Sequence, residues 1–195
     1  ELYLVDASSK GIEVTELTTV DKTRTSIELI LKDVDAELLT GSSDKSVIEK
    51  VLDAGRLMLS ADTVGAAQVM LDKSVAYSLE RKQFGRLIGS FQAVKHMCAE
   101  MAADLEPCHS MIWHAAHCLD NVPEEARLMA CQTKAHISEV GKQVSKTATE
   151  VHGGMGFTDE LGLHYWFKRI GLNRQLLGSP ELIREEAGKL QGFDQ

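Results

Sequence analysis

The chain has 195 residues, of which 44% are hydrophobic and 26% are charged, a balance typical of a folded globular protein with one sizeable core. Lys and Arg number 21 against 29 Asp and Glu, and the net charge of −8 argues against nucleic-acid and anionic-membrane partners. The four cysteines lack paired CxxC spacing and there is no run of 18 apolar residues, so we expect reduced thiols, a cytoplasmic location and no membrane span.

The first 32 residues have the composition of β-strands. Strands are predicted at 2–5, 11–15 and 26–31, with a Ser-Ser-Lys-Gly turn at 8–11. These few strands lack the partners that would complete a sheet, and the chain opens without Met in what reads as a strand. We therefore expect residues 1–44 to be the C-terminal part of a truncated β-domain.

Long helices are expected from residue 45 onward. The first covers 46–79, contains no proline and is rich in Ala, Leu and Met. The second has apolar residues at alternating spacings of three and four, which predicts a buried seam. Pro107 interrupts this helix and predicts a kink. The seam residues are Phe91, Val94, Cys98, Met101, Leu105, Cys108 and Ile112.

A turn at 121–123 leads into a third helix that ends at Gly153-Gly154. A shorter helix is expected at about 160–176, and a last one begins at Pro180 with Ser179 as its N-cap. The sequence thus predicts a mainly α fold: an antiparallel up-and-down helical bundle over 45–195, preceded by a few β-strands. The buried stripe of the third helix is formed by Ile137, Val140, Val144, Ala148 and Val151.

The segment RKQFGR at 81–86 places three cations within six residues of an acidic protein. Arginine offers a planar fork of donors to phosphate oxygens, so this loop is a candidate site for a diphosphate. The alternative is a solvated loop in which Phe84 simply plugs the bundle. Gly153 and Gly154 likewise could cap a helix, allow a ligand to approach the backbone closely, or do both.

Taken together, AYSLERKQFGRLIGSFQ at 76–92 and VHGGMGFTDE at 151–160 resemble the C-terminal helical domain of the acyl-CoA dehydrogenases. The resemblance covers nearly the whole chain and implies FAD as cofactor, an acyl-CoA substrate and desaturation of that substrate. Gln83 stands where relatives often have Thr, and Glu150 stands where they usually have Gln. The implied FAD contacts, made across a subunit interface, are Arg81, Gln83, Phe84, Gln92, Glu150, Gly153, Gly154 and Ser179.

The reaction of that family needs a carboxylate base to remove the α-proton of the thioester. The resemblance places the base Glu at one of two positions, which are Leu177 and Gly55 here, so no catalytic residue is expected at either. Asp53 and Arg56 match a pattern that faces the acyl-CoA and are the expected substrate-binding residues. Asp62, two turns beyond Gly55, is a candidate for a displaced base, and the alternative is a polar residue capping a modified pocket.

His114, His117 and His152 have no Asp, Glu or Cys at convincing ligand spacing, so we expect structural histidines and no metal site. The ending LHYWFKRIGLNRQLLGSPELIREE is similar to actinobacterial acyl-CoA dehydrogenase subunits that work as two-chain assemblies on bulky CoA thioesters. Three hypotheses stay open. The chain is a subunit without a base that works with a second acyl-CoA dehydrogenase subunit, a self-sufficient homotetrameric enzyme with a relocated base, or a helical assembly scaffold that has lost its flavin.

Overall fold

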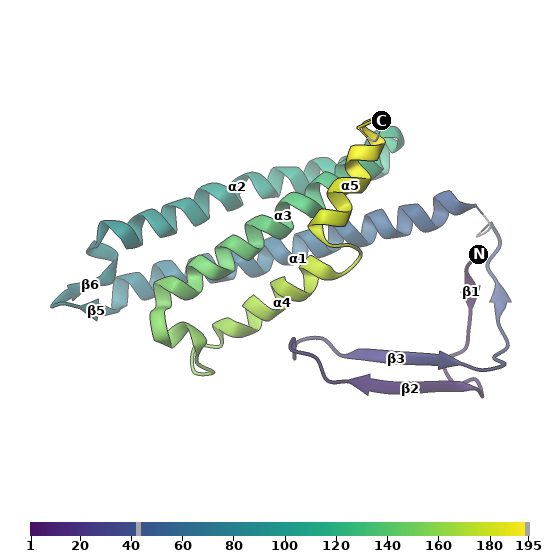
Figure 1. The fold of residues 1–195 in the computed structure, drawn as a ribbon, viewed down its shortest axis with the longest axis horizontal. Helices are drawn as coiled ribbons and strands as arrows, with labels where there is room; N and C mark the ends of the chain where they lie inside the picture. The colour runs from purple at the N-terminus through teal and green to yellow at the C-terminus, as the bar shows by residue number, and fades with distance from the viewer. Residues whose placement is uncertain (42–43, 194–195) are drawn as a thin grey trace. The chain divides into compact units, whose positions relative to one another are not determined.

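The computed structural model describes residues 1–41 and 44–193. Contacts divide the chain into two compact units, Glu1–Leu52 and Asp53–Gln195, and the boundary falls inside the first helix. The first unit contains the strands β1 to β4, whereas the second contains most of the helical part of the chain together with the short strands β5 and β6 (Figure 1). None of the helices in the described ranges combines the length and the apolar character needed to cross a bilayer.

The first unit contains two separate antiparallel strand pairs, β1 with β4 and β2 with β3. Apolar side chains of the longer pair, among them Val14, Ile27 and Leu29, are exposed. Two-stranded ribbons with exposed apolar side chains do not make a core of their own. The strands are β1 (Tyr3–Leu4), β2 (Ile12–Leu17), β3 (Ser26–Leu31) and β4 (Glu37–Leu38), of which β4 was not predicted.

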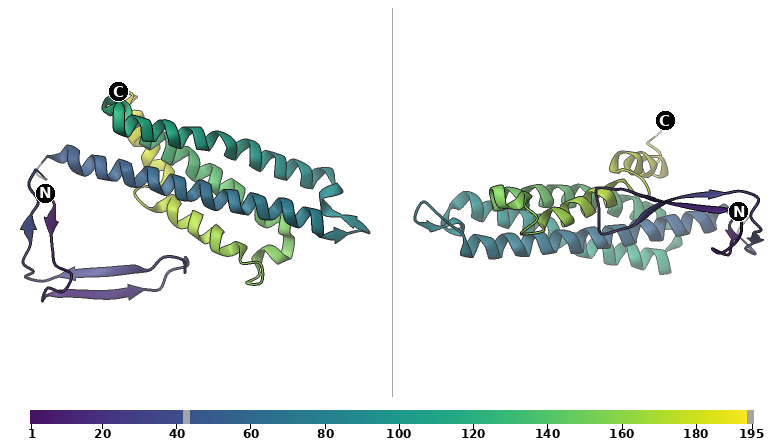
Figure 2. Two further views of the ribbon diagram at one scale, coloured as in Figure 1. Left: turned by 180° about the vertical axis from the view of Figure 1, so that it is seen from behind. Right: turned by 90° about the horizontal axis from the view of Figure 1, so that it is seen from below.

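The helices confirm the predicted fold class. Consecutive helices α1, α2 and α3 run antiparallel, and α4 returns along α3 (Figures 1 and 2). The short α5 packs on the first half of α3, where Cys131 and Ala135 contact Ile183 and Ala187. The helices are α1 (Lys45–Glu80), α2 (Gln92–Asn121), α3 (Pro123–His152), α4 (Leu163–Gln175) and α5 (Pro180–Leu190).

One hydrophobic core joins α1, α2, α3 and α4. Met101 and Leu105 of the predicted α2 seam are almost completely buried, and the α3 stripe lies in the same cluster. The prediction that Phe91 is buried is wrong. Phe91 is the N-cap of α2 and is only half-buried. The apolar spacing in the sequence extends to Phe91, but this residue precedes the first turn of the packed helix. The helix itself continues through Pro107 as a single element.

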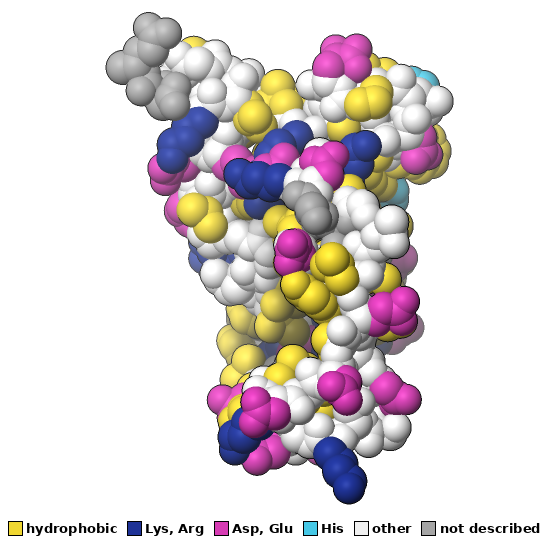
Figure 3. Space-filling model, turned by 90° about the vertical axis from the view of Figure 1, so that its right-hand side faces the viewer, with side chains coloured by type: hydrophobic (Ala, Val, Ile, Leu, Met, Phe, Trp, Pro, Cys, Tyr) yellow, Lys and Arg dark blue, Asp and Glu magenta, His cyan; other side chains and the backbone are white. Residues whose placement is uncertain are grey.

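On the face of the molecule drawn in Figure 3, Lys and Arg side chains lie next to Asp and Glu side chains, with hydrophobic groups between them. On this face the cations therefore lie among carboxylates. Several of them form ion pairs, including Arg56, Arg169 and Arg174.

Candidate functional site

The predicted basic loop is a tight β-hairpin between α1 and α2, formed by β5 (Lys82–Gln83) and β6 (Arg86–Leu87). Its two tip residues, Phe84 and Gly85, have φ angles of 53° and 77°. Two positive φ values are typical of a type I′ turn, which is unfavourable for an aromatic residue. The Phe84 side chain is 91% exposed, so it does not plug its own bundle. The hairpin presents a large apolar group to solvent on a well-defined turn.

The three cations of this segment have different surroundings. Arg81 lines a cavity of about 400 Å³ beside the hairpin. The guanidinium of Arg86 lies 3.9 Å from the centre of the Phe91 ring, a cation–π contact. Lys82 is exposed and does not line the cavity. Of the three, Arg81 is therefore the cation placed to bind an anion there.

The cavity lies where the end of α1, the hairpin and the end of α3 meet. Its wall includes the ring of His152, which stacks on Tyr77 with a centroid separation of 4.6 Å. The buried His152 also makes a 2.7 Å hydrogen bond between Nδ1 and the Ala148 carbonyl oxygen, which fixes the ring as a structural element. Five of the eight predicted cofactor residues line this cavity: Arg81, Gln83, Glu150, Gly153 and Gly154.

The glycines at the end of α3 leave the backbone open to the cavity. Gly153 has a φ of 58°, and a Cβ added at Gly153 or Gly154 would meet no atom within 4 Å. Peptide groups there are accessible to a bound group, as the prediction requires. Arg81 and this exposed backbone fit a phosphate-bearing cofactor, whereas the exposed Glu150 carboxylate adds negative charge to the same wall.

Three predicted cofactor residues lie outside the cavity lining. Phe84 is at the hairpin tip, Gln92 is exposed at the first position of α2, and Ser179 is the N-cap of α5. Figure 1 places the hairpin at one end of the bundle and α5 toward the other. A single copy of this chain thus brings five of the predicted cofactor residues together around one cavity, and the other three lie outside it.

The two predicted base positions lie against each other. A Cβ on Gly55 would stand 2.6 Å from the Cδ1 methyl of Leu177. Leu177 has a φ of 57°, and Gly178 after it has a φ of 110°, so the loop between α4 and α5 turns sharply at this point. An aliphatic side chain therefore occupies the space between the two positions, and neither position offers a carboxylate.

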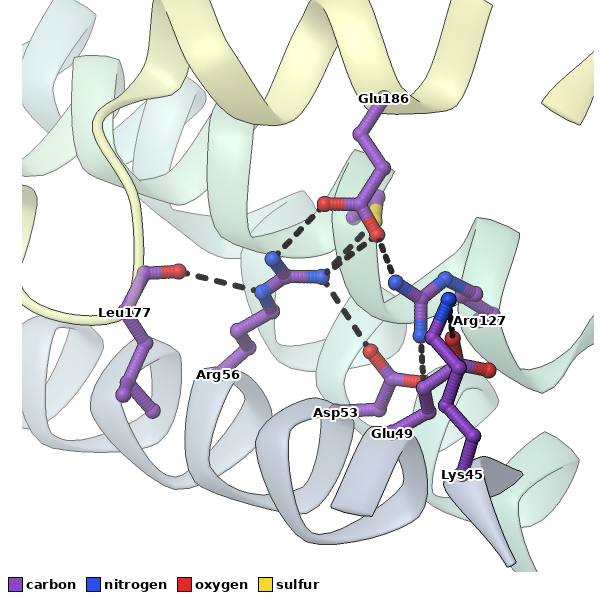
Figure 4. Close-up of polar contacts among 8 residues, drawn as sticks. Lys45, Glu49, Asp53, Arg56, Arg127, Leu177 and Glu186 are labelled. Carbon is purple, nitrogen blue, oxygen red and sulfur yellow. Dashed lines mark hydrogen bonds and ion pairs between the residues drawn. The ribbon is translucent and has the colours of Figure 1, made fainter. Parts of the chain in front are cut away.

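Asp53 and Arg56, the predicted substrate-binding residues, form a buried ion-pair network (Figure 4). Arg56 makes a two-pronged contact with Glu186 of α5, at 3.1 Å and 2.8 Å, and its Nε donates to the Leu177 carbonyl oxygen at 3.2 Å. Arg127 of α3 pairs with both Glu186 and Asp53. The Arg56 guanidinium therefore donates to acceptors within this chain, and it links α1 to α5 and to the loop that contains Leu177.

Burial and charge act in opposite directions within this network. Burial raises the pKa of the Asp53 carboxyl, and the nearby Arg127 and Arg56 partly offset that effect. Hydrogen bonding from Arg56 lowers the pKa of Glu186, and burial raises the pKa of the Cys131 thiol, next to Arg56, to about 12. Removing one partner would leave a buried charge uncompensated, which is costly. Glu186 and Arg127 could not be predicted as partners of Arg56 from the sequence, because no local pattern links them to it.

Asp62, the candidate displaced base, is paired. Its Oδ2 accepts from Arg169 Nε at 2.8 Å and from Asn173 Nδ2 at 2.6 Å, and its side chain is 33% exposed. A displaced base with a raised pKa would need desolvation without such a partner. This geometry argues against a displaced base, because Asp62 joins α1 to α4; the predicted alternative was a polar residue that caps a modified pocket.

Lys134 is a further buried cation, and no sequence pattern marks it. Its Nζ donates to the Asn173 carbonyl oxygen at 2.7 Å and to Ser138 Oγ at 3.1 Å. It thus satisfies carbonyl oxygens at the C-terminal end of α4, immediately before the loop that contains Leu177. Burial lowers the pKa of Lys134 to about 8.

Comparison with known proteins gives a consistent result. Residues 45–190 match the family model for "Acyl-CoA dehydrogenase, C-terminal domain". Two similar curated proteins are the Caffeyl-CoA reductase-Etf complex subunit CarC of Acetobacterium woodii, 39% identical over 111 residues, and the acyl-CoA dehydrogenase IpdE2 of Mycolicibacterium smegmatis, 34% identical over 139 residues. A solved steroid ACAD, Tcur3481-Tcur3483, superposes with a TM-score of 0.87 at 26% identity.

These matches cover most of this chain but only part of the relatives. They span 57% of this chain and 29% of CarC, and 71% of this chain and 42% of IpdE2. The steroid ACAD comparison covers 98% of this chain and 51% of the other. The chain therefore corresponds to about half, or less, of the length of the proteins that it resembles.

Proposed function

Because the chain belongs to the acyl-CoA dehydrogenase family, through its C-terminal helical domain, we propose that it is a subunit of an FAD-dependent enzyme that desaturates an acyl-CoA thioester. In this proposal the chain contributes flavin and interface contacts, and a second acyl-CoA dehydrogenase subunit supplies the catalytic base. The supporting observation is the contact between Leu177 and Gly55, which leaves no carboxylate at either expected base position.

The flavin part of the proposal rests on the cavity beside the hairpin. FAD, when bound, would supply the acceptor for the hydride that leaves the β-carbon of the substrate. Arg81 would hold a phosphate through charge-assisted hydrogen bonds, while the open backbone at Gly153 and Gly154 would allow close approach. Phe84 and Gln92 would contact a flavin bound mainly by a neighbouring subunit, as would Ser179, because they lie outside this cavity.

The substrate part of the proposal assigns an indirect role to Asp53 and Arg56. Their charged groups are buried and face Glu186 and Arg127. Arg56 also binds the Leu177 carbonyl oxygen, so it holds the loop that forms an apolar wall where other members have a Glu. We propose that the pair shapes the acyl-CoA site by fixing this wall.

Two of the similar proteins support a partner subunit. CarC is named as a subunit of a complex with Etf, and the steroid ACAD has a two-part designation, Tcur3481-Tcur3483. By the same likeness, we propose that this chain belongs to a heteromeric assembly that acts on a bulky CoA thioester, such as a sterol side-chain derivative. The pairing of Asp62 with Arg169 and Asn173 argues against a self-sufficient enzyme that uses Asp62 as its base.

A visible absorption spectrum tests the proposal directly. The full-length protein is purified alone and after co-expression with candidate partner subunits, and each sample is assayed for acyl-CoA dehydrogenation. We expect flavin absorbance and activity only in the co-expressed sample. Yellow, active protein in the absence of a partner would instead establish the self-sufficient homotetramer, and colourless protein under every condition would establish the scaffold.

A further inference from the structure

A second cluster of reactive side chains lies at the turn between α2 and α3, away from the hairpin cavity. His114 and Cys118 are one turn apart on α2, and Glu125 is in the first turn of α3. The ligand atoms of these three residues all lie within 4.8 Å of one another, and His114 Nε2 is 3.9 Å from Cys118 Sγ. Glu125 comes from a different helix, so sequence spacing around the histidines did not indicate it.

The separation of the nitrogen and the sulfur fits two ligands of one metal ion. Zinc binds imidazole nitrogen at about 2.0–2.1 Å and thiolate sulfur at about 2.3 Å, so a tetrahedral ion separates these ligand atoms by about 3.6 Å. The observed 3.9 Å requires only a small adjustment. Glu125 is exposed and its flexible side chain can close the remaining distance, while the exposed His114 keeps one side of the site open to water.

The charges around Cys118 favour a cation at the same point. Cys118 is fully buried, and its surroundings include the carboxylates of Glu124 and Glu125. The C-terminal end of α2 at Asn121, three residues beyond Cys118, adds the negative end of that helix's dipole. A divalent ion bound to one thiolate and one carboxylate would be neutral overall, which suits a partly buried site.

We propose that His114, Cys118 and Glu125 form a binding site for a divalent transition metal, with Zn²⁺ as the best match to one imidazole, one thiolate and one carboxylate. Water completes the tetrahedral coordination. On binding, the Cys118 S–H bond breaks, a sulfur–metal bond forms and one proton is released to solvent. The metal would join the end of α2 to the start of α3, a role separate from flavin chemistry.

Cobalt titration of the full-length protein tests this site. The protein is stripped with a chelator under reducing conditions and titrated with Co²⁺, which reports thiolate ligation through a sulfur-to-metal charge-transfer band. We expect one equivalent to bind, with that band, with proton release and with displacement by Zn²⁺. Cys118→Ser should remove the band, and His114→Ala or Glu125→Gln should weaken binding by about tenfold or more.

Matched variants make the result specific. His117→Ala removes a neighbouring imidazole that hydrogen-bonds with Asn121, and Cys98→Ser removes a thiol on the same helix, so both should bind Co²⁺ as the unchanged protein does. If Cys118→Ser fails to fold, the two exposed ligands, His114 and Glu125, still decide the outcome. Binding without a thiolate band, or equal losses in His114→Ala and His117→Ala, would overturn the proposal.

Discussion

The Cδ1 methyl of Leu177 lies 2.6 Å from the point where a Cβ on Gly55 would stand, although the two residues are 122 positions apart. Gly55 is on α1 and Leu177 is on the loop between α4 and α5. The contact joins the two positions at which the sequence resemblance placed the base. It also makes the identity of each residue depend on the other, since a side chain at Gly55 has to displace Leu177.

That contact predicts an energetic coupling. Gly55→Ala gains helix propensity of about 1 kcal/mol, but the steric conflict with Leu177 costs about 1–3 kcal/mol, so the single variant should be neutral or mildly destabilised. In a Leu177→Ala background the conflict disappears, and Gly55→Ala should stabilise the protein by about 1 kcal/mol. Chemical denaturation of the four proteins measures the coupling. Additive effects, within about 0.5 kcal/mol, would mean that the two side chains do not meet.

The core of the bundle gives a second prediction. Met101 is almost fully buried in the cluster shared by α1, α2, α3 and α4. Met101→Asp places an unpaired charge there and should lower the free energy of unfolding by about 3–5 kcal/mol. Thermal unfolding measures the loss. Ala102→Asp, at the next and exposed position, is the matched control and should have little effect; an equal loss in both variants would contradict the assigned seam.

Local features of this fold were predictable from the sequence, and the reasons are physical. Met101 and Leu105 of α2, like Ile137 and Val144 of α3, repeat with the helical period because each of these two helices has one buried face. Ser179 and Pro180 mark the start of α5 because the fixed φ of proline suits the first position of a helix, which is a local preference, although the Ser179 side chain makes no capping hydrogen bond. The same periodicity misplaced Phe91, because a period identifies a face of a helix but not where the neighbouring helices end.

Long-range features were not predictable from the sequence. Arg56 and Glu186 are 130 positions apart, and Lys134 reaches a carbonyl oxygen 39 positions away. Such pairs depend on how α3, α4 and α5 pack, which no local pattern encodes. The hairpin at the predicted basic loop was also missed, since two-residue strands are too short to show alternation. Its turn explains why Arg81 and Arg86 face different surroundings.

The buried Lys134 predicts a specific dependence of stability on pH. Its pKa is lowered from 10.5 to about 8 in the folded protein, so the unfolded chain binds more protons between pH 8 and 10.5. The contribution of Lys134 to stability therefore rises as pH increases through that range. Relative to Lys134→Met, the unchanged protein should gain about 1–3 kcal/mol from pH 8 to pH 10.5.

Comparing the two proteins at each pH isolates this effect. The buried Cys108 and Cys131 thiols, whose pKa values are raised to about 11 and 12, act in the opposite direction in both proteins and cancel in the difference. Denaturant unfolding at a series of pH values provides the measurement. A difference that stays flat across the range would show that Lys134 titrates as an exposed lysine does.

The cavity beside the hairpin predicts unequal roles for two adjacent cations. Arg81→Ala should cost about 1.5–3 kcal/mol of flavin binding in the assembled enzyme, roughly a tenfold to a hundredfold loss of affinity, because a charge-assisted contact is removed. Lys82→Ala removes the same charge next to it but outside the cavity lining, so its effect should be small. Flavin titration of apoprotein measures both. Equal losses would indicate a diffuse electrostatic effect instead of a contact at Arg81.

The source of the catalytic base gives the last prediction. Leu177 and Gly55 offer no carboxylate, and Asp62 is paired with Arg169 and Asn173. In the assembled enzyme, Asp62→Asn should therefore retain most of the activity. Replacing the Glu that we propose as the base in the partner subunit with Gln should lower turnover by several orders of magnitude, because a positioned base is lost. Single-turnover reduction of the bound flavin measures both. Loss of flavin reduction in Asp62→Asn, with flavin still bound, would place the base on this chain and favour the self-sufficient enzyme.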